Sequence, residues 1–149
     1  MKKGILLTRV SAKPGQEDEF LNWYRSYFTP YVASLPGFVS ARVMRFKRPA
    51  SNEEAGSPNA FDFLTIYELE ADDLQTPLRH LREAEVGHGD CIKITEAVSF
   101  DPVPTEWLYE DLFVTSKPTS REGLEWRGKE SESAAVETVV DKVLGWVPD

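Results

Sequence analysis

Eight apolar or aromatic side chains between residues 20 and 35 recur at the spacing of one helical face, and this pattern constrains the fold more than any other feature. They are Phe20, Trp23, Tyr24, Tyr27, Phe28, Tyr31, Val32 and Leu35. Because positions i, i+3, i+4, i+7 and i+8 lie on one side of a helix, the spacing predicts a helix over residues 16–35. Pro30 removes a backbone donor, so we expect a kink or a restart there.

The rest of the first 114 residues alternates between strand and helix signals. A second helix should carry Leu74, Leu78 and Leu81 on one stripe, with Asp72 or Asp73 as its N-cap. Strands are predicted over residues 4–10, 38–48, 61–70 and 91–100, with a further strand over 107–114. The order β-α-β-β-α-β predicts an α+β fold of the ferredoxin-like kind, an antiparallel sheet with its helices on one face.

The first predicted strand is apolar on both faces, with Ile5 and Leu7 on one and Leu6 and Val10 on the other. A strand with two apolar faces must be buried on both sides, and two helices on the same side of the sheet bury only one of them. We therefore expect a homodimer in which two sheets pack face to face.

Charge and cysteine content narrow the class of protein. The 149 residues carry 25 acidic and 17 basic side chains, a net charge of −8, and an acidic surface is repelled by phosphate backbones and anionic lipid. Nucleic-acid and membrane partners are therefore not expected. Cys91 is the one cysteine, which fits a reducing compartment, and with no signal peptide or spanning stretch in sight we expect a cytoplasmic protein. The spacing of His80, His88 and Asp90 matches no familiar metal motif, so neither a metal nor a cofactor is expected.

The last 35 residues read as an addition to this domain. Residues 115–132 have the composition of a linker, and valines after residue 135 return at helical spacing. We predict a domain over 1–114 and an extension over 115–149 that consists of a linker and a C-terminal helix.

The order of motifs resembles the dimeric α+β barrel superfamily, closest to its EthD-like branch. The most specific element is W-Y-x(5)-P-x(4)-L-P-G-F, present here as Trp23-Tyr24, Pro30 and residues 35–38. The resemblance covers roughly residues 4–114 and implies a ligand cavity between the helices and the sheet. The superfamily includes cyclases, lyases, decarboxylases, cofactor-free oxygenases and haem enzymes.

Two local features bear on the chemistry that this resemblance implies. The branch usually has a histidine two residues before the proline, and Phe28 stands at that position here. The turn AEVGHGD, residues 84–90, is similar to the A-H-V-G-F-G-D turn of plant olivetolic acid cyclase, whose histidine is replaced here by Glu85.

Three candidate catalytic residues and seven candidate substrate-binding residues follow from these patterns. A histidine in a glycine turn can transfer protons, an arginine among apolar neighbours can anchor an anion or a carbonyl, and a buried tyrosine needs a partner for its hydroxyl. The catalytic candidates are His88, Arg42 and Tyr27. The substrate-binding candidates are Trp23, Tyr24, Tyr31, Phe28, Arg9, Tyr67 and Glu85.

A structural interpretation competes with each assignment. The aromatic stripe is either a packed core face or a cavity wall, an arginine either forms a salt bridge, extends to solvent or anchors a ligand, and His88 is either an exposed turn residue or an acid–base group. Three functions therefore stay open. The first is a cofactor-independent cyclase, dehydratase, isomerase or lyase acting on an aromatic or polyketide-like molecule of secondary metabolism. The others are a non-catalytic binding dimer and a structural dimer without a site.

Overall fold

The computed structural model describes residues 1–47, 61–86 and 92–128. The chain separates into two compact units, residues 1–46 with 61–113, and residues 47–60 with 114–149. Every described helix and strand belongs to the first unit. The described part of the second unit, Lys47 and residues 114–128, contains neither. The predicted C-terminal helix lies outside the described residues, and the predicted division after residue 114 stays a prediction.

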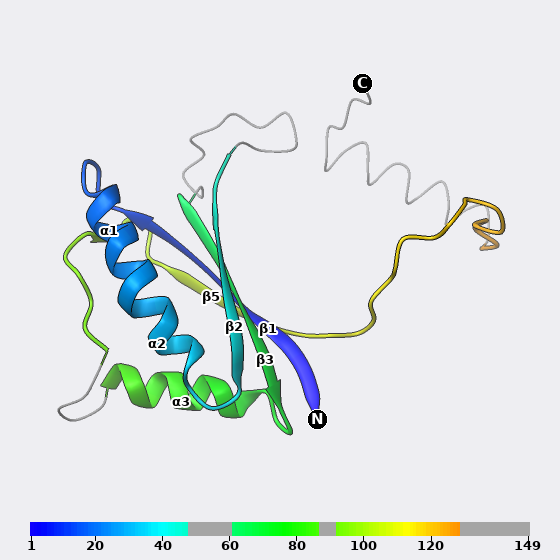
Figure 1. Cartoon of the computed structure of the whole chain (residues 1–149), viewed down its shortest axis with the longest axis horizontal. Helices are drawn as coiled ribbons and strands as arrows, with labels where there is room; N and C mark the ends of the chain where they lie inside the picture. Colours follow the sequence, from blue (N-terminus) through cyan, green and yellow to red (C-terminus); the bar gives the residue numbers. More distant parts are fainter. Residues whose placement is uncertain (48–60, 87–91, 129–149) are drawn as a thin grey trace. The chain divides into compact units, whose positions relative to one another are not determined.

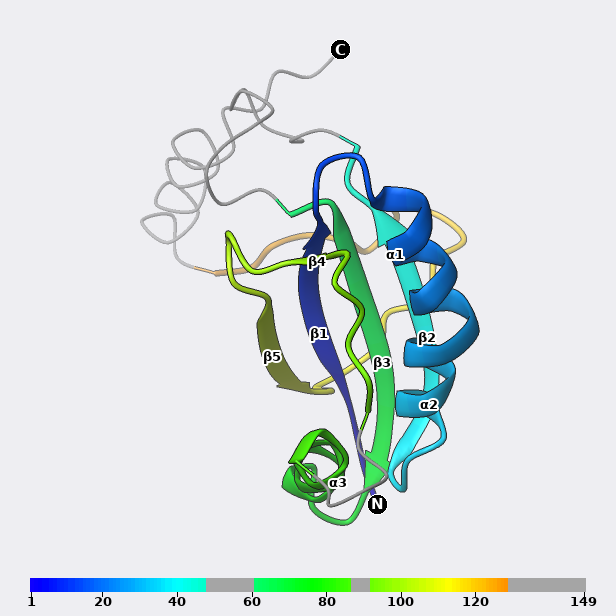
Figure 2. The same cartoon turned by 90° about the vertical axis from the view of Figure 1, so that its left-hand side faces the viewer.

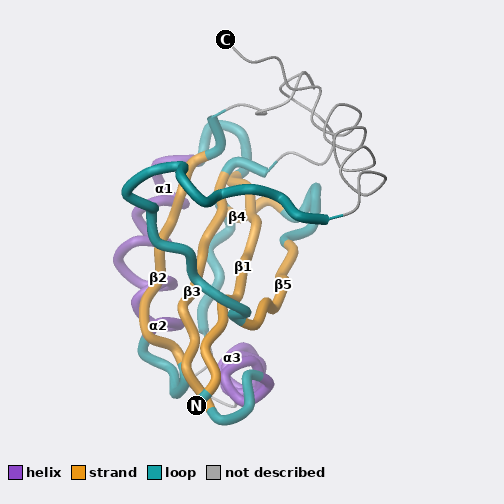
Figure 3. The backbone as a smooth tube through the Cα atoms, turned by 90° about the vertical axis from the view of Figure 1, so that its right-hand side faces the viewer, coloured by secondary structure: helices purple, strands orange, loops and turns teal. Residues whose placement is uncertain are grey.

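The first unit is built on an antiparallel sheet. Its strands are β1 (Lys2–Ala12), β2 (Phe38–Arg45), β3 (Phe63–Ala71), β4 (Val98–Ser99) and β5 (Thr105–Glu110). β3 pairs with β2 on one edge and with β1 on the other. Both β4 and β5 pair with β1, so β2, β3, β1 and β5 lie side by side in that order (Figure 3).

The helices lie together on one side of this sheet (Figures 1 and 2). A first helical stretch consists of α1 (Glu17–Trp23), a π-helical turn η1 (Tyr24–Phe28) and α2 (Thr29–Ala33), and the second helix is α3 (Gln75–Val86). The element order and the strand order together confirm the predicted α+β fold of the ferredoxin-like kind.

The interruption expected at Pro30 takes the form of the π-helical turn. Proline has no N–H and its ring crowds the carbonyl one turn earlier, which disfavours a regular α-helix at that point. The Thr29 N–H reaches back five residues to the Tyr24 carbonyl, and the Thr29 hydroxyl donates to the same oxygen at 2.8 Å. The stretch therefore widens by one residue just before Pro30 and then continues as α2.

Alternation along residues 38–48 predicts that Val39, Ala41 and Val43 share one face, and this facing is wrong at the start of β2. The alternation places Phe38 on the same face as Arg42 and Met44, but a β-bulge between Phe38 and Ser40 inserts one residue. Phe38 therefore shares the helix side with Ala41, is buried, and contacts Tyr67 edge-on with ring centroids 5.7 Å apart. Arg42 and Met44 stay on the opposite face, paired with Ile66 and Leu64.

The predicted strand over residues 91–100 is also wrong for most of its length. Only Val98 and Ser99 pair with β1, and residues 92–95 form no strand. Ile92, Ala97 and Val98 are nevertheless buried on the helix side, in the two clusters of the core. Their alternation with polar residues arises because a loop packs its apolar side chains into the core. The strand that pairs with most of this edge of β1 is β5.

The start of α3 follows its prediction. The Asp73 carboxylate accepts a hydrogen bond of 2.9 Å from the Gln75 N–H, so Asp73 is the acidic residue that caps this end. Pro77 lies in the first turn, where a missing N–H costs nothing. Leu74 and Leu81 are buried against the sheet.

Candidate functional site

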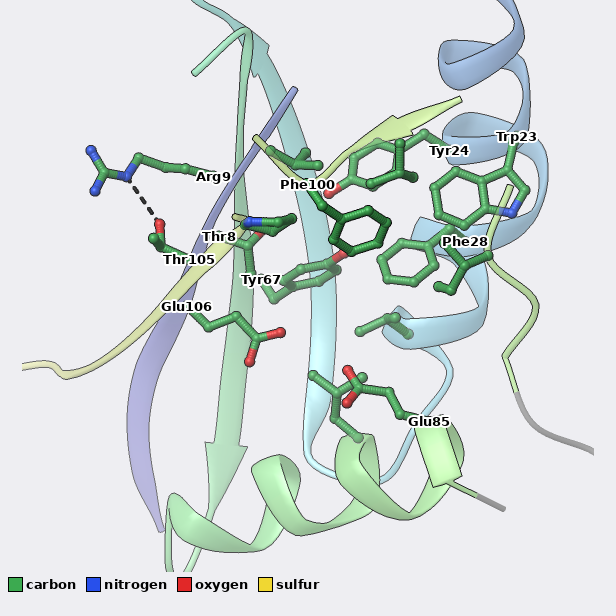
Figure 4. Close-up of a pocket in the computed structure, with 16 residues that line it drawn as sticks. Thr8, Arg9, Trp23, Tyr24, Phe28, Tyr67, Glu85, Phe100, Thr105 and Glu106 are labelled. Carbon is green, nitrogen blue, oxygen red and sulfur yellow. Dashed lines mark hydrogen bonds between the residues drawn. The ribbon is translucent and has the colours of Figure 1, made fainter. Parts of the chain in front are cut away.

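A cavity of about 200 Å³ lies between the helices and the sheet, beside β5 (Figure 4). Its walls come from β1, β3, β5, the first helical stretch, α3 and the segment after residue 93. The apolar lining residues are Val10, Trp23, Tyr24, Phe28, Val32, Tyr67, Leu81, Ile94, Val98, Phe100 and Pro104. The remaining ones are Thr8, Arg9, Glu85, Thr105 and Glu106. A mainly apolar cavity with a few polar groups is the usual character of a small-molecule site.

The aromatic wall is fixed by ring contacts. Phe28 stacks on Tyr24 with centroids 5.4 Å apart and meets Trp23 at 4.8 Å. The Trp23 indole N–H donates to the Lys93 carbonyl at 3.0 Å, which ties this wall to the segment that follows α3. The rings therefore hold their positions beside the cavity without filling it.

Hydroxyl groups gather where β1 and β3 face the cavity. The Tyr24 hydroxyl and the Thr65 hydroxyl share a hydrogen bond of 2.7 Å. The Tyr67 hydroxyl and the Thr8 hydroxyl are both buried and lie close enough to the Tyr24 hydroxyl to shift its pKa. Neither completes a hydrogen bond of good geometry within the described part of the chain, because the Tyr24 hydroxyl is engaged with Thr65. Leaving such a group unpaired costs about 1–3 kcal/mol, so these two hydroxyls mark the wall as a place for a ligand or for water.

Both tyrosines stay protonated far above neutral pH. Burial raises the pKa of Tyr67, and the nearby Tyr24 hydroxyl and the charge of Glu106 raise it further. Burial also raises the pKa of Tyr24, partly offset by the hydroxyls of Thr65, Thr8 and Tyr67. Each phenol is therefore available as a hydrogen-bond donor and not as a base.

Two carboxylates lie at the cavity wall, and one arginine connects them. Arg82 on α3 contacts Glu85 Oε2 at 2.9 Å through Nη1 and binds Glu106 on β5 through Nη2. The hydrogen bond to Glu106 is the main reason why the pKa of Arg82 is raised. The ion pair between Arg82 and Glu106 joins α3 to β5. Two negative charges and one positive charge therefore lie at this side of the site.

Six of the ten predicted site residues line this cavity: Trp23, Tyr24, Phe28, Arg9, Tyr67 and Glu85. Arg9 lines the cavity but does not direct its charged group at a ligand, as an anchor for an anion or a carbonyl would. Its guanidinium points away from the cavity in Figure 4, donates to the Thr105 hydroxyl at 3.2 Å and lies 5.0 Å from the centre of the Phe61 ring.

Three other predicted residues lie outside the cavity lining. Arg42 is exposed on the sheet face opposite the helices. The Tyr27 hydroxyl accepts a hydrogen bond of 3.0 Å from the Lys93 N–H, and the Tyr31 ring packs 5.9 Å from that of Tyr27. The fourth, His88, lies outside the described residues.

Ten of the sixteen lining residues were not predicted from the sequence, and Thr8, Phe100 and Glu106 are the ones that bear most on function. Thr8 was detectable, because alternation along β1 places it on the same face as Leu6 and Val10. Glu106 was not, because its facing depends on the register of β5, in which it pairs with Thr8. Phe100 follows a two-residue strand and reaches the cavity from a loop.

A second groove, of about 230 Å³, lies between the first helical stretch and β2. It is lined by Leu21, Tyr24, Arg25, Thr29, Val43, Met44, Arg45 and Phe63. Arg45 already binds Glu17, and the Thr29 hydroxyl already donates to the backbone. The unpaired hydroxyls face the first cavity, which is therefore the better candidate site.

Metal ligands do not gather anywhere in the described ranges: no group of three or more histidine, cysteine, aspartate or glutamate side chains is placed to hold an ion. Across those same residues, no helix has the length and apolar character needed to cross a membrane.

Comparisons with known proteins add little to this picture. No family model matches the chain, and no curated protein matches it. A crystal structure of a "putative monooxygenase" from Shewanella loihica PV-4 is similar over 76% of this chain and 99% of its own, with 14% sequence identity and a TM-score of 0.45. Similarity at this level carries no information on function, and the fold assignment rests on the strand order itself.

Proposed function

We propose that this chain is a small-molecule enzyme that performs cofactor-independent proton transfer on an aromatic or polyketide-like substrate, as a cyclase, dehydratase, isomerase or lyase. The observation that carries the proposal is the Glu106 carboxylate at the wall of an apolar cavity that also holds protonated phenols. A base beside an oxygen-binding donor is the minimum needed to remove a proton next to a carbonyl.

The residues divide this work between them. Glu106 takes the proton from the carbon next to the carbonyl, and the electron pair moves onto the carbonyl oxygen to give an enolate. The Tyr67 hydroxyl donates a hydrogen bond to that oxygen, and Glu106 returns the proton to the substrate or to a new position. Trp23 and Phe28 hold the apolar body of the substrate. His88 stays a candidate for a second proton-transfer group.

Exchange of deuterium into a simple ketone tests this chemistry. Acetophenone is incubated with the protein in D₂O, and loss of its methyl proton signal is followed by NMR. We expect exchange above the buffer rate, reduced about 100-fold or more in Glu106→Gln. Glu110→Gln is the matched control, because Glu110 lies on the same strand and pairs with Lys2 at the surface.

The outcomes separate the three functions. Exchange that depends on Glu106 supports the enzyme. Binding of acetophenone without exchange supports a non-catalytic binding protein, and neither binding nor exchange supports a structural dimer without a site.

We also propose that the chain forms a homodimer through the open sheet face. This face carries Trp107 and Tyr109 of β5, which are 51% and 53% exposed. It also carries Ile66 and Leu64 of β3, which pair with Arg42 and Met44 of β2. The helices lie on the other side (Figure 1), so no helix among the described residues of the first unit covers the aromatic face. Native mass spectrometry at micromolar concentration should show a dimer, and a monomer would refute the proposal.

A further inference from the structure

Three hydroxyl groups line the cavity where β1, β3 and η1 meet, those of Tyr24, Thr8 and Tyr67, and a fourth, that of Thr65, is buried behind them. Between them the structure makes one hydrogen bond of good geometry, which the Tyr24 and Thr65 hydroxyls share at 2.7 Å and in which either group can donate. The Tyr67 side chain is 1% exposed and the Thr8 oxygen is buried, so bulk water does not satisfy either of them. Figure 4 shows Thr8 and Tyr67 at the cavity wall. They are diagonal neighbours on one face of the sheet, because Thr8 pairs with Thr65 and Tyr67 lies two residues further along β3.

Replacing either group would remove the cost of an unpaired hydroxyl without changing the shape of the wall. Phenylalanine in place of tyrosine and valine in place of threonine have nearly the same volume, and both suit a strand. A pair of donors kept unpaired in an otherwise apolar cavity indicates that a third group completes them.

The geometry points to a neutral carbonyl oxygen as that group, so that the substrate class is an uncharged aryl ketone or aldehyde whose oxygen sits between the Thr8 and Tyr67 hydroxyls. This inference rests on the proposed function, whose substrate it specifies. A carbonyl oxygen has two lone pairs and no proton, and it can therefore accept from both hydroxyls at once.

Charge excludes a carboxylate in the same position. Glu106 faces the site closely enough to act on both tyrosines, and Glu85 lines the cavity as well. Arg82 is already bound to these two carboxylates, and the Arg9 guanidinium points away. An anionic head group would thus meet negative charge with no free cation from the described lining residues beside it.

The volume sets the size of the ligand. A cavity of about 200 Å³ is slightly larger than an engineered apolar cavity of about 150 Å³ that binds benzene. One aromatic ring with a short carbonyl substituent fits this space. The ring then lies against Phe28 and Trp23, and the carbonyl points toward β1 and β3.

Three probes of nearly equal size test the inference on the full chain. Acetophenone carries the carbonyl, ethylbenzene lacks it, and benzoate carries a negative charge. NMR titration at pH 7 gives the dissociation constant of each. We expect acetophenone to bind at least about tenfold more tightly than either of the others, since two buried hydroxyls go unpaired with ethylbenzene.

Variants identify the groups responsible. Tyr67→Phe should lower the affinity for acetophenone about tenfold and leave that for ethylbenzene unchanged, and Thr8→Val should act in the same direction. Tyr109→Phe, on the opposite sheet face, is the matched control and should change neither. Equal affinities for acetophenone and ethylbenzene would overturn the inference, and we would expect them if only water hydrogen-bonds to the two hydroxyls. Tighter binding of benzoate than of acetophenone would also overturn it.

The two proposals fail separately. Carbonyl-selective binding without deuterium exchange refutes the enzyme and leaves the binding inference in place. Exchange that depends on Glu106, together with equal affinities for acetophenone and ethylbenzene, supports proton transfer by Glu106 and overturns the carbonyl inference, including the donor role of Tyr67.

Discussion

Two buried tyrosines, Tyr24 and Tyr67, line the same cavity, but their hydroxyl groups have opposite effects on the stability of the folded protein. Tyr24 shares a hydrogen bond with Thr65, a residue with no exposed surface, and so its hydroxyl contributes to stability. The Tyr67 hydroxyl is buried with no such partner in the described chain, so it lowers the stability of the folded protein. A group that a fold keeps at a cost is best explained by a use in binding or catalysis.

The matched pair Tyr67→Phe and Tyr24→Phe separates these roles. Tyr67→Phe should leave the free energy of unfolding unchanged or raise it by about 1 kcal/mol, because it removes an unpaired buried group. Tyr24→Phe should lower it by about 1–3 kcal/mol, because Thr65 is then left unpaired. Urea unfolding measures both, and equal losses would show that Tyr67 is hydrogen-bonded after all.

Ionisation of the same two residues predicts how stability depends on alkaline pH. Burial raises the pKa of each in the folded state, so the unfolded chain loses these protons first, near its ordinary pKa of about 10. Stability should therefore be constant with respect to these groups below pH 10 and fall as pH rises above it. Absorbance at 295 nm should show that Tyr24 and Tyr67 ionise only as the chain unfolds, and reversible early titration of all five tyrosines would contradict this.

At the scale of the elements, the junction between the first helical stretch and β2 places the aromatic wall against the sheet. Gly37 has a φ of +89°, and a Cβ at this position would lie 2.5 Å from Pro77 Cγ at the start of α3. Both the left-handed backbone and the close approach of the second helix require glycine here. The helical stretch has already ended at Ala33, and the missing side chain at Gly37 allows the start of α3 to pack closely against the connection to β2.

Alanine at two glycines separates backbone strain from crowding. Gly15 has a φ of +80° with nothing within 4 Å of its Cβ position, so Gly15→Ala should cost about 1–2 kcal/mol from the backbone alone. Gly37→Ala should cost about 1–3 kcal/mol more, because Pro77 must move. Thermal unfolding compares the two variants, and equal losses would show that the Pro77 contact is unimportant.

The sequence predicted helices and strands well where apolar residues recur at a single regular spacing. It predicted them poorly where packing placed a bulge or a buried loop within such a pattern. The helical stripe of residues 20–35 and the strands around Leu6 and Tyr67 follow from their spacing. The bulge before Ser40 and the loop around Ala97 do not, because an inserted residue and a buried loop leave the same alternation as a strand. Glu106 entered the site by way of a strand register that no local pattern encodes.

For the molecule as a whole, the two faces of the sheet have different predicted partners. The helix side encloses the cavity, and the open side is the proposed dimer interface. Ile66 lies near its middle, paired with Leu7 on one side and Arg42 on the other. A charge there should oppose the burial of a second sheet while costing little in a monomer.

Ile66→Lys should therefore convert the dimer to a monomer in native mass spectrometry. Val86→Lys is the control, since Val86 is 74% exposed on α3 and should leave the assembly unchanged. A dimer that persists in Ile66→Lys would place the interface elsewhere.

The location of a bound aromatic ketone tests whether the cavity beside β5 is the binding site. Intermolecular NOEs between acetophenone and the isotope-labelled protein report which side chains it touches. We expect NOEs to Trp23, Phe28 and Val98, which line the cavity beside β5. NOEs to Leu21, Val43 and Met44 instead would place the ligand in the second groove and contradict the proposed site.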